Sequence, residues 1–301
     1  MKLPLVVGVD GSEHSLRAAD WAADEAALRQ VPLRVVYASL WEFPQALGSV
    51  RAGGTPTEGA AFARELGKPD GQVRAEDVVE AAAHRARVRH PGLPISRAAL
   101  PEEPEYALVR EGKNASALVV GTRGRSGVTN LLLGSVSLFV AGHADCPVIV
   151  VRGNNDNQAR TAVHSRVVVG VGDGSAGAVR FAAQEAGRRG AVLEAVRAWR
   201  CPAHESVDHP LITGEPERVH EERAAQALEA ALRDVPPRVE VERRTVEGPA
   251  RKVLLAAAHE ADLLVVGARR RPGRFGPRLG RTAHTVLHHA ACPIAVVPER
   301  A

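Results

Sequence analysis

The sequence repeats itself, and this repeat constrains the fold more than any other feature. Each half begins with a valine-rich segment that ends in glycine and serine, continues to a second apolar segment that ends in glycine, and closes on a Cys-Pro segment. These segments, LVVGVDGS, ALVVG and CPVIVV at residues 5–12, 117–121 and 146–151, recur as VVVGVGDGS, LLVVG and CPIAVV at residues 167–175, 263–267 and 292–297. The sequence therefore predicts two similar units in tandem.

The spacing of the repeated segments locates the boundary between the two units. The later segments are offset by 146 residues, whereas the opening segments are offset by 162 or 163, so the first copy is longer in its middle. The excess falls within residues 40–72, which are rich in glycine and proline and which we interpret as a long loop. Residues 153–158 are polar and form the predicted linker. We predict two domains, residues 1–152 (the first copy) and 165–299 (the second copy).

Each copy alternates segments typical of buried strands with segments of helical periodicity. Alternating strands and helices favour a parallel sheet with helices on both faces. The predicted fold is therefore α/β, with two tandem doubly wound domains that each hold a five-stranded parallel sheet flanked by helices. The expected strands are residues 4–10, 35–38, 95–100, 117–121 and 147–151, then 166–171, 192–198, 239–246, 262–267 and 293–297. The expected helices are the one that Ser12 caps, then 75–89, 104–113 and 135–143, and in the second copy 176–189, 215–233, 248–259 and 281–290.

The composition excludes several classes of protein. The chain of 301 residues is 45% hydrophobic, enough for two ordinary cores, but no apolar run approaches the roughly 20 residues that cross a bilayer. The net charge is +4 with both signs spread along the chain, and no basic motif is interleaved with aromatic residues. The three cysteines form no CxxC pair, which fits a reducing compartment. We expect a cytoplasmic protein without a signal peptide and without a membrane or nucleic-acid partner.

Three glycines lie at the end of the fourth predicted strand and in the segment after it, at defined intervals. Two residues separate Gly121 from Gly124, and nine more separate Gly124 from Gly134 and Ser135, where a helix begins. Glycines let backbone N–H groups approach phosphate oxygens, and the N-terminus of a helix favours an anion. The first strand ends at Asp10, which can accept hydrogen bonds from ribose hydroxyls or hold a metal-bound water. Because open parallel sheets bind ligands at the carboxyl ends of their strands, we predict a polyphosphate site here.

This loop and its flanking strands resemble the universal stress protein family. ATP-binding members of that family carry a Gly-x2-Gly-x9-Gly-Ser/Thr loop, and the segments VVGVDGS, GSVS and CPVIVV agree with the family as well. The resemblance covers nearly the whole chain and implies that the first copy binds an adenine nucleotide, ATP with Mg2+. It also implies contacts through the fifth strand of each copy, in a homodimer or in an intramolecular pseudo-dimer, and an unidentified protein partner. ATP and a related nucleotide, such as a cyclic one, are not distinguished.

The resemblance assigns roles to matching positions. Asp10 would face the ribose or the metal, Ala38 would offer backbone groups to the adenine edge, and Gly121 would contact the ribose and phosphate region. The glycines after it and Ser135 would hold the phosphates. The full predicted binding set is Asp10, Gly11, Ser12, Ala38, Gly121, Gly124, Arg125, Gly134, Ser135, Val136 and Ser137, with no catalytic residue and no metal site.

Simpler structural roles remain open for the same residues. Gly124 and Gly134 can be ordinary turn and helix-start glycines. Asp10 can cap the first helical turn, alone or with Ser12, which does not exclude ligand binding.

The second copy departs from the loop pattern. Its first and last glycines are kept as Gly267 and Gly280, but Arg270 replaces the middle glycine and Arg281 replaces the serine. Each change places a bulky cation where a phosphate would lie against the backbone. We interpret this site as lost or altered, and the alternative is a rebuilt site, because guanidinium groups bind phosphate well.

Two further details of the second copy stay open. Gly273 and Gly276 provide a different glycine spacing, and the extra residue Gly172 makes it uncertain whether Gly172 or Asp173 matches Asp10. We interpret the run of arginines between residues 269 and 281 as a solvated loop, with an anion contact as the alternative. Near the C-terminus, one group of residues has metal-like spacing. We favour a structural role for this group, His284, His288, His289 and Cys292.

The sequence contains no catalytic constellation that stands out. It lacks a GxSxG elbow, and no lysine follows the glycine loop as in a Walker A motif. We therefore expect an ATP-binding stress or signalling protein without dedicated catalysis, in which nucleotide occupancy changes partner contacts. The alternatives are a slow ATPase or autokinase and a scaffold that works without nucleotide.

Overall fold

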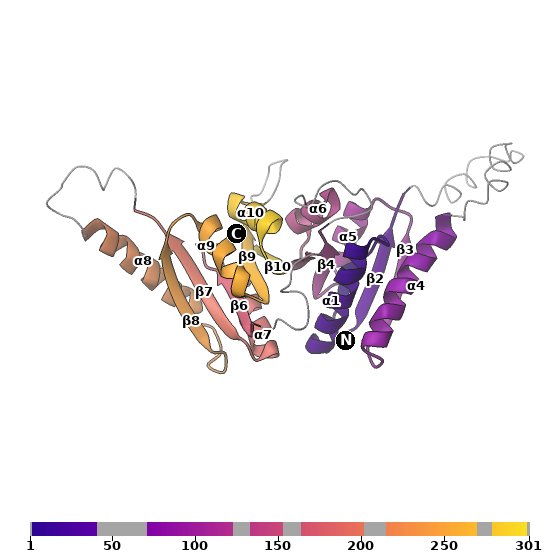
Figure 1. Ribbon diagram of the computed structural model, residues 1–301, viewed down its shortest axis with the longest axis horizontal. Helices are drawn as coiled ribbons and strands as arrows, with labels where there is room; N and C mark the ends of the chain where they lie inside the picture. The colour runs from indigo at the N-terminus through magenta and orange to yellow at the C-terminus, as the bar shows by residue number, and fades with distance from the viewer. Residues whose placement is uncertain are drawn as a thin grey trace, which may run out of the picture.

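The structure is a computed structural model in which the two copies lie side by side (Figure 1). It describes residues 2–40, 71–122, 133–152, 164–201, 215–269 and 279–299. The first copy contains β1 (Leu5–Gly8), α1 (Glu13–Arg29), β2 (Leu33–Ala38), α4 (Gly71–Arg89), β3 (Ile95–Leu100), α5 (Pro104–Gly112), β4 (Ala117–Gly121), α6 (Ser135–His143) and β5 (Val148–Val151). The second contains β6 (Arg166–Gly170), α7 (Ala176–Arg189), β7 (Val192–Trp199), α8 (Glu215–Leu232), β8 (Val241–Glu247), α9 (Ala250–Ala257), the 3-10 helix η2 (Ala258–Glu260), β9 (Leu263–Arg269), α10 (Arg281–His289) and β10 (Ile294–Glu299).

The strands form one ten-stranded sheet in the order β3-β2-β1-β4-β5-β10-β9-β6-β7-β8. The five strands within each copy pair in parallel, as the sequence predicts. The two copies meet where β5 and β10 pair antiparallel, with Ile149 opposite Ala295. The predicted α/β fold is confirmed, and the pairing of the fifth strands is the intramolecular arrangement that the family resemblance implied. Most of the predicted loop within residues 40–72 and the whole predicted linker at 153–158 lie outside the described residues, so the domain boundaries stay a prediction.

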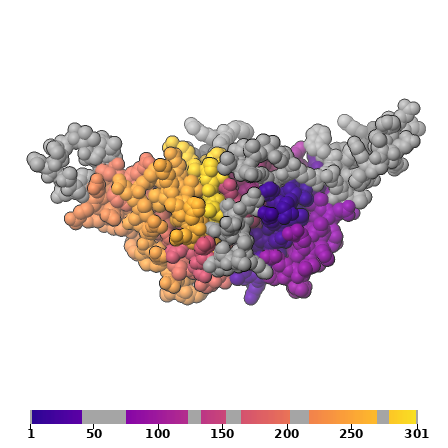
Figure 2. Space-filling view, in the orientation of Figure 1, coloured from indigo at the N-terminus to yellow at the C-terminus, as the bar shows by residue number. Residues whose placement is uncertain are grey.

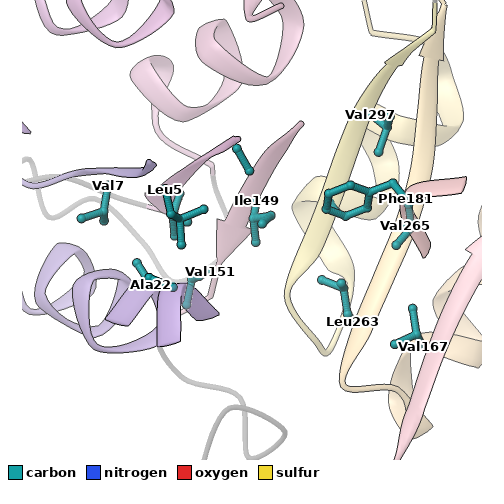
Figure 3. Close-up of a cluster of buried hydrophobic side chains, with 14 of the residues drawn as sticks. Leu5, Val7, Ala22, Ile149, Val151, Val167, Phe181, Leu263, Val265 and Val297 are labelled. Atoms are coloured by element: carbon teal, nitrogen blue, oxygen red, sulfur yellow. The ribbon is translucent and has the colours of Figure 1, made fainter. Parts of the chain in front are cut away.

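Alternating apolar side chains on the strands build a core on each face of this sheet. One core packs against α1, α4, α7 and α8, and the other packs against α5, α6, α9 and α10. The first core is continuous between the copies, because Ile149 and Val151 of β5 belong to the same cluster as Leu263 and Val265 of β9 (Figure 3). The C-terminal segment, yellow in Figure 2, lies at the centre of the molecule, where the second copy meets the first. No helix of the described chain is long and apolar enough to cross a membrane.

Helices α1 and α7 end in the same backbone conformation but on different residues. Gln30 follows α1 with φ 54° and ψ 49°, and Gly190 follows α7 with φ 59° and ψ 33°. The left-handed region costs a residue with a Cβ about 1–2 kcal/mol, whereas glycine enters it freely. The first copy therefore stores strain at this cap that the second copy avoids.

Substitutions at the two cap residues should change the free energy of unfolding in opposite directions. We expect Gln30→Gly to raise the free energy of unfolding by about 0.5–1 kcal/mol, because the relief of strain exceeds the extra entropy of an unfolded glycine. Gly190→Ala should lower it by about 1 kcal/mol, since open space surrounds the position and only the backbone conformation resists the change. Urea denaturation of both variants measures the effect, and equal shifts of one sign would contradict it.

Four charged side chains meet where α1 packs against α7 at the junction of the copies, three of them buried and the fourth, Arg189, partly buried. Glu25 contacts Arg29 (Oε1 to Nε, 2.6 Å) and Arg189 (Oε2 to Nη2, 2.5 Å). Glu185 contacts Arg29 (Oε1 to Nη2, 3.2 Å) and also Arg189. The side chains of both glutamates are at most 3% exposed, so each depends on the arginines for its polar contacts. We call Glu25, Arg29, Glu185 and Arg189 the junction quartet.

The two carboxyl groups of the junction quartet differ in acidity. Burial raises the pKa of Glu25 to about 7, and the neighbouring Glu185 adds to this effect although the arginines oppose it. Burial also disfavours ionisation of Glu185, but the charges of Arg189 and Arg29 outweigh it and hold that pKa below its ordinary value. Since the carboxyl groups interact closely, they titrate as a pair, in which Glu185 is the more acidic group.

Candidate functional site

The turn between β1 and α1 is held together by its own polar side chains. Asp10 Oδ1 accepts hydrogen bonds from the backbone N of Ser12 at 3.0 Å and from its Oγ at 2.6 Å. Ser12 is the N-cap of α1, and its Oγ accepts from the backbone N of Ser15. The turn passes through Gly11, whose φ of 82° favours glycine. Asp10 therefore fixes the capping residue rather than capping the helix itself, and the expected strand at residues 4–10 ends earlier, at Gly8.

The other side of the candidate site is the segment that enters α6. Gly134 is the N-cap of this helix, and its backbone N donates to the carbonyl of Thr122 at 2.6 Å. Ser137 Oγ donates to the carbonyl of Gly121 at 2.6 Å, which fixes α6 to the end of β4. Ser135 opens the helix with its side chain exposed. Hydrogen bonds therefore tie the last residues of the predicted phosphate loop to its first residues, Gly121 and Thr122. They hold the N-terminus of α6 at the carboxyl edge of the sheet.

These two segments enclose a cleft of about 200 Å³ at the carboxyl ends of β1, β2 and β4. Of the predicted binding set, Asp10, Ala38, Gly121, Gly134, Ser135, Val136 and Ser137 line the cleft. Gly11 and Ser12 do not line it and act through the turn, and Gly124 and Arg125 lie outside the described residues. The sequence reasoning missed one wall, formed by Gly8, Val9, Ser15, Val36, Pro104, Leu108 and Val120.

The missed wall depends on a glycine. A Cβ at Gly8 would lie 2.8 Å from Leu108 Cδ1, so a larger residue would project into the cleft or displace Leu108. The second copy repeats this geometry, because a Cβ at Gly170 would lie 2.8 Å from Leu254 Cδ1. The repeat of this glycine in both opening segments is the sequence signal that could have identified it.

The second copy has a larger cleft of about 920 Å³ at the matching edge, lined by Arg197, Arg269 and Arg281 among others. Gly172 lies two residues after the end of β6, as Asp10 lies two residues after the end of β1, so Gly172 takes the place of Asp10. Asp173 does not repeat the turn of the first copy, since its Oδ1 accepts from Arg197 Nη2 at 2.9 Å and its carbonyl accepts from Arg269. The hydrogen bond from Arg197 and the positive charge lower the pKa of Asp173.

A carboxylate from β10 also lies in the second cleft. Glu299 is 7% exposed, and its oxygens accept from the backbone N of Gly177 at 2.9 Å and of Ala178 at 2.7 Å. These N–H groups belong to the first turn of α7, where the helix dipole favours a negative charge. A Cβ at Gly267 would come within 3.0 Å of the same carboxylate. The protein's own anion thus occupies this helix N-terminus beside the first glycine of the degenerate loop.

The structure gives no support to a metal site near the C-terminus. Within the described ranges, no group of three or more histidine, cysteine, aspartate or glutamate residues could hold a metal ion. Burial raises the pKa of the Cys292 thiol to about 12, which disfavours the thiolate that a metal requires. The rings of His284 and His288 contact each other at a tilt of 41°, with their centroids 4.6 Å apart. Of the arginine run, residues 270–278 lie outside the described chain.

Comparison with known proteins agrees with this arrangement. The model of the universal stress protein family matches the chain twice, over residues 3–152 and 164–298. The chain belongs to the universal stress protein family. A universal stress protein of Mycobacterium tuberculosis is 32% identical over 311 residues, covering 99% of this chain and 97% of that protein. One from Mycolicibacterium smegmatis is 31% identical over 301 residues, covering 98% and 97%.

A solved structure supports the fold of this universal stress protein over its full length. The crystal structure of a universal stress protein from Archaeoglobus fulgidus superposes with a TM-score of 0.64 and covers 98% of each chain. Its sequence identity is 18%, so the likeness concerns the fold alone.

Proposed function

We propose that this universal stress protein binds ATP in its first copy and acts in stress response or signalling through nucleotide occupancy, without dedicated catalysis. The observation that carries the proposal is the cleft between the Asp10 turn and the start of α6. There the intact glycine loop returns to the carboxyl edge of the sheet at Gly134 and Ser135. Backbone N–H groups at a helix N-terminus bind phosphate without further side chains.

The walls of the first cleft fit an adenine nucleotide. Val36, Pro104 and Leu108 give an apolar side for a base, and the missing side chain of Gly8 leaves room beside them. Asp10 and the N-terminus of α6 give a polar side for a ribose and phosphates. Asp10 is the one carboxylate among the described lining residues, and Mg2+ is commonly held by one carboxylate together with substrate phosphates. Mg2+ would neutralise phosphate charge when bound.

The second cleft keeps the glycines at positions 267 and 280 but differs from the first at two features that bear on phosphate binding. Arg281 replaces Ser135, and Glu299 places a fixed negative charge beside Gly267. A triphosphate that approached Gly267 would meet this carboxylate at close range, which disfavours binding. We therefore propose that ATP binds at one site per chain.

Calorimetric titration of Mg-ATP into nucleotide-stripped protein tests this proposal. We expect one saturable site per chain. Two equivalent sites would mean that the arginines rebuilt the second site, and no saturable binding would favour the nucleotide-independent scaffold. ATP turnover that persists through repeated purification and is lost in Ser135→Ala would favour a slow ATPase or autokinase instead.

A further inference from the structure

Helix α10 of the second copy contacts the segment that enters the nucleotide cleft of the first. The backbone N of Leu133 donates a hydrogen bond of 3.4 Å to Nδ1 of His288. Leu133 immediately precedes Gly134 and Ser135, the residues that open α6. In Figure 1, α10 and α6 lie on either side of the junction at the same edge of the sheet. A side chain of one copy therefore contacts the backbone that presents the predicted phosphate-binding groups of the other.

A second contact fixes α10 in this position. Arg152, directly after β5, donates from Nη1 to the carbonyl of Leu287 at 3.2 Å. This carbonyl lies in the last turn of α10, where a cation complements the helix dipole. Because Arg152 belongs to the first copy, the end of α10 that carries His288 is tied to the first copy from two directions.

The surroundings of His288 keep its imidazole in the form that accepts this hydrogen bond. Burial lowers the pKa of His288, and His284, His289 and Arg152, which face it from α10 and from the end of β5, lower it further. The ring is therefore neutral at pH 7, with its proton on Nε2 and a lone pair on Nδ1. Nε2 is buried and has no hydrogen-bond partner among the described residues. A second proton would go to Nδ1, where it would face the N–H of Leu133 and remove the acceptor of this hydrogen bond.

The contact from α10 to the other copy has no counterpart at the matching position of the first copy. At the offset of 146 residues that relates the two copies here, His288 corresponds to Gly142. Glycine has no side chain that can accept a hydrogen bond, so the matching position of the first copy cannot make this contact. The asymmetry matches that of the loops, since the copy with the intact glycine pattern receives the contact.

We propose that His288 is a positioning residue for the nucleotide site of the first copy. Its Nδ1 holds the peptide that leads into Gly134, while Thr122 of the first copy holds the N–H of Gly134 itself from the other side. Together they set the direction in which the N-terminus of α6 faces the cleft. This inference rests on the proposed function, because its consequence for affinity requires that the first copy binds a nucleotide.

Calorimetric titration of Mg-ATP at pH 7.5 compares four full-length proteins. We expect His288→Ala to weaken binding about three- to tenfold, the effect of one neutral hydrogen bond. His288→Asn should bind as the wild type does, because the asparagine Oδ1 can accept from Leu133 N. His289→Ala is the matched control on the same helix and should leave the affinity unchanged.

The pH dependence separates positioning from packing. In the wild type, affinity should hold at neutral pH and fall only at a pH below the ordinary range of imidazole, because a protonated Nδ1 can no longer accept. His288→Asn carries no titrating group and should lack the part of this fall that belongs to His288. Identical pH profiles for the two proteins would overturn the inference.

Amide exchange without nucleotide distinguishes failure of this inference from failure of the proposed function. We expect NMR to show faster exchange at Leu133 and Gly134 in His288→Ala than in the wild type and in His288→Asn. If the wild type binds no ATP but this pattern appears, the proposed function fails and the positioning role stands. If the wild type binds ATP and His288→Ala matches it in both affinity and exchange, the positioning role fails.

Discussion

Glu185→Gln is expected to lower the free energy of unfolding by about 3–5 kcal/mol. The substitution keeps the size and shape of the side chain but removes the charge that Arg29 and Arg189 face inside the junction quartet. Removing one partner of a buried ion pair leaves the other charge without compensation in a site from which water is excluded. Urea denaturation at pH 6 measures the loss.

Glu25→Gln is the matched control for this prediction. Because burial raises the pKa of Glu25 to about 7, its carboxyl group is largely protonated at pH 6, and a neutral glutamine replaces it there at a cost below about 1 kcal/mol. Equal losses for the two variants would contradict the assignment of charge within the quartet. The exposed pair Glu13 and Arg17 provides a surface reference, where Glu13→Gln should change stability by less than about 0.5 kcal/mol.

The same variant gives the sign of the pH dependence. A carboxyl group whose pKa is raised in the folded state stabilises the fold fully below its unfolded value of 4.5, and this contribution is lost as the pH rises through about 7. The wild type should therefore lose about 3 kcal/mol relative to Glu25→Gln between pH 4.5 and pH 8. Stability that rises in this range, relative to the variant, would show that Glu25 is ionised throughout.

Gly8→Val is expected to weaken ATP binding by about 10- to 100-fold. The new side chain would enter the space between β1 and Leu108, on the apolar side of the first cleft. Overpacking of this kind costs about 1–3 kcal/mol, and each 1.4 kcal/mol corresponds to a tenfold change in affinity. Calorimetric titration measures the change, and thermal denaturation reports how much of it reflects a weakened fold.

Gly170→Val is the control that the repeat itself provides. Its Cβ meets Leu254 in the second copy at the same distance at which a Cβ at Gly8 meets Leu108, so the two variants should lower the melting temperature similarly. Only Gly8→Val should affect ATP binding if the site lies in the first copy. If only Gly170→Val weakened ATP binding, the nucleotide site would have to lie in the second cleft.

The sequence predicts the fold well because the repeat and the strand periodicity are local signals. Its errors are also local, as at the end of the chain, where the apolar run stops at Val297 but β10 continues through Pro298 to Glu299. Proline normally ends a strand, yet here β10 pairs with β9 as far as Arg269, while its pairing with β5 already stops at Val296. The two added residues carry Glu299 to the start of α7, and no pattern in the sequence predicts that contact.

The pairing of the fifth strands was implied by the family resemblance, but the side-chain contacts between the copies could not be predicted from sequence patterns. Glu25 and Arg29 lie four residues apart on a helix, a spacing that is typical of solvated ion pairs on a surface. Their burial arises only because α7, some 160 residues later, brings Glu185 and Arg189 against them. His288 could be seen in the sequence as part of a metal-like group, but its hydrogen bond to Leu133 depends on how the two halves join.

The antiparallel pairing of β5 with β10 has a consequence for how such a molecule depends on its own abundance. Two separate chains that met along this strand would come apart on dilution, and their joint behaviour would vary with their abundance. Here both partners belong to one polypeptide, so the pairing has the same effective concentration whether few molecules are present or many. Every molecule also contains one cleft of each kind in a fixed ratio, and each half can change its sequence without imposing that change on the other.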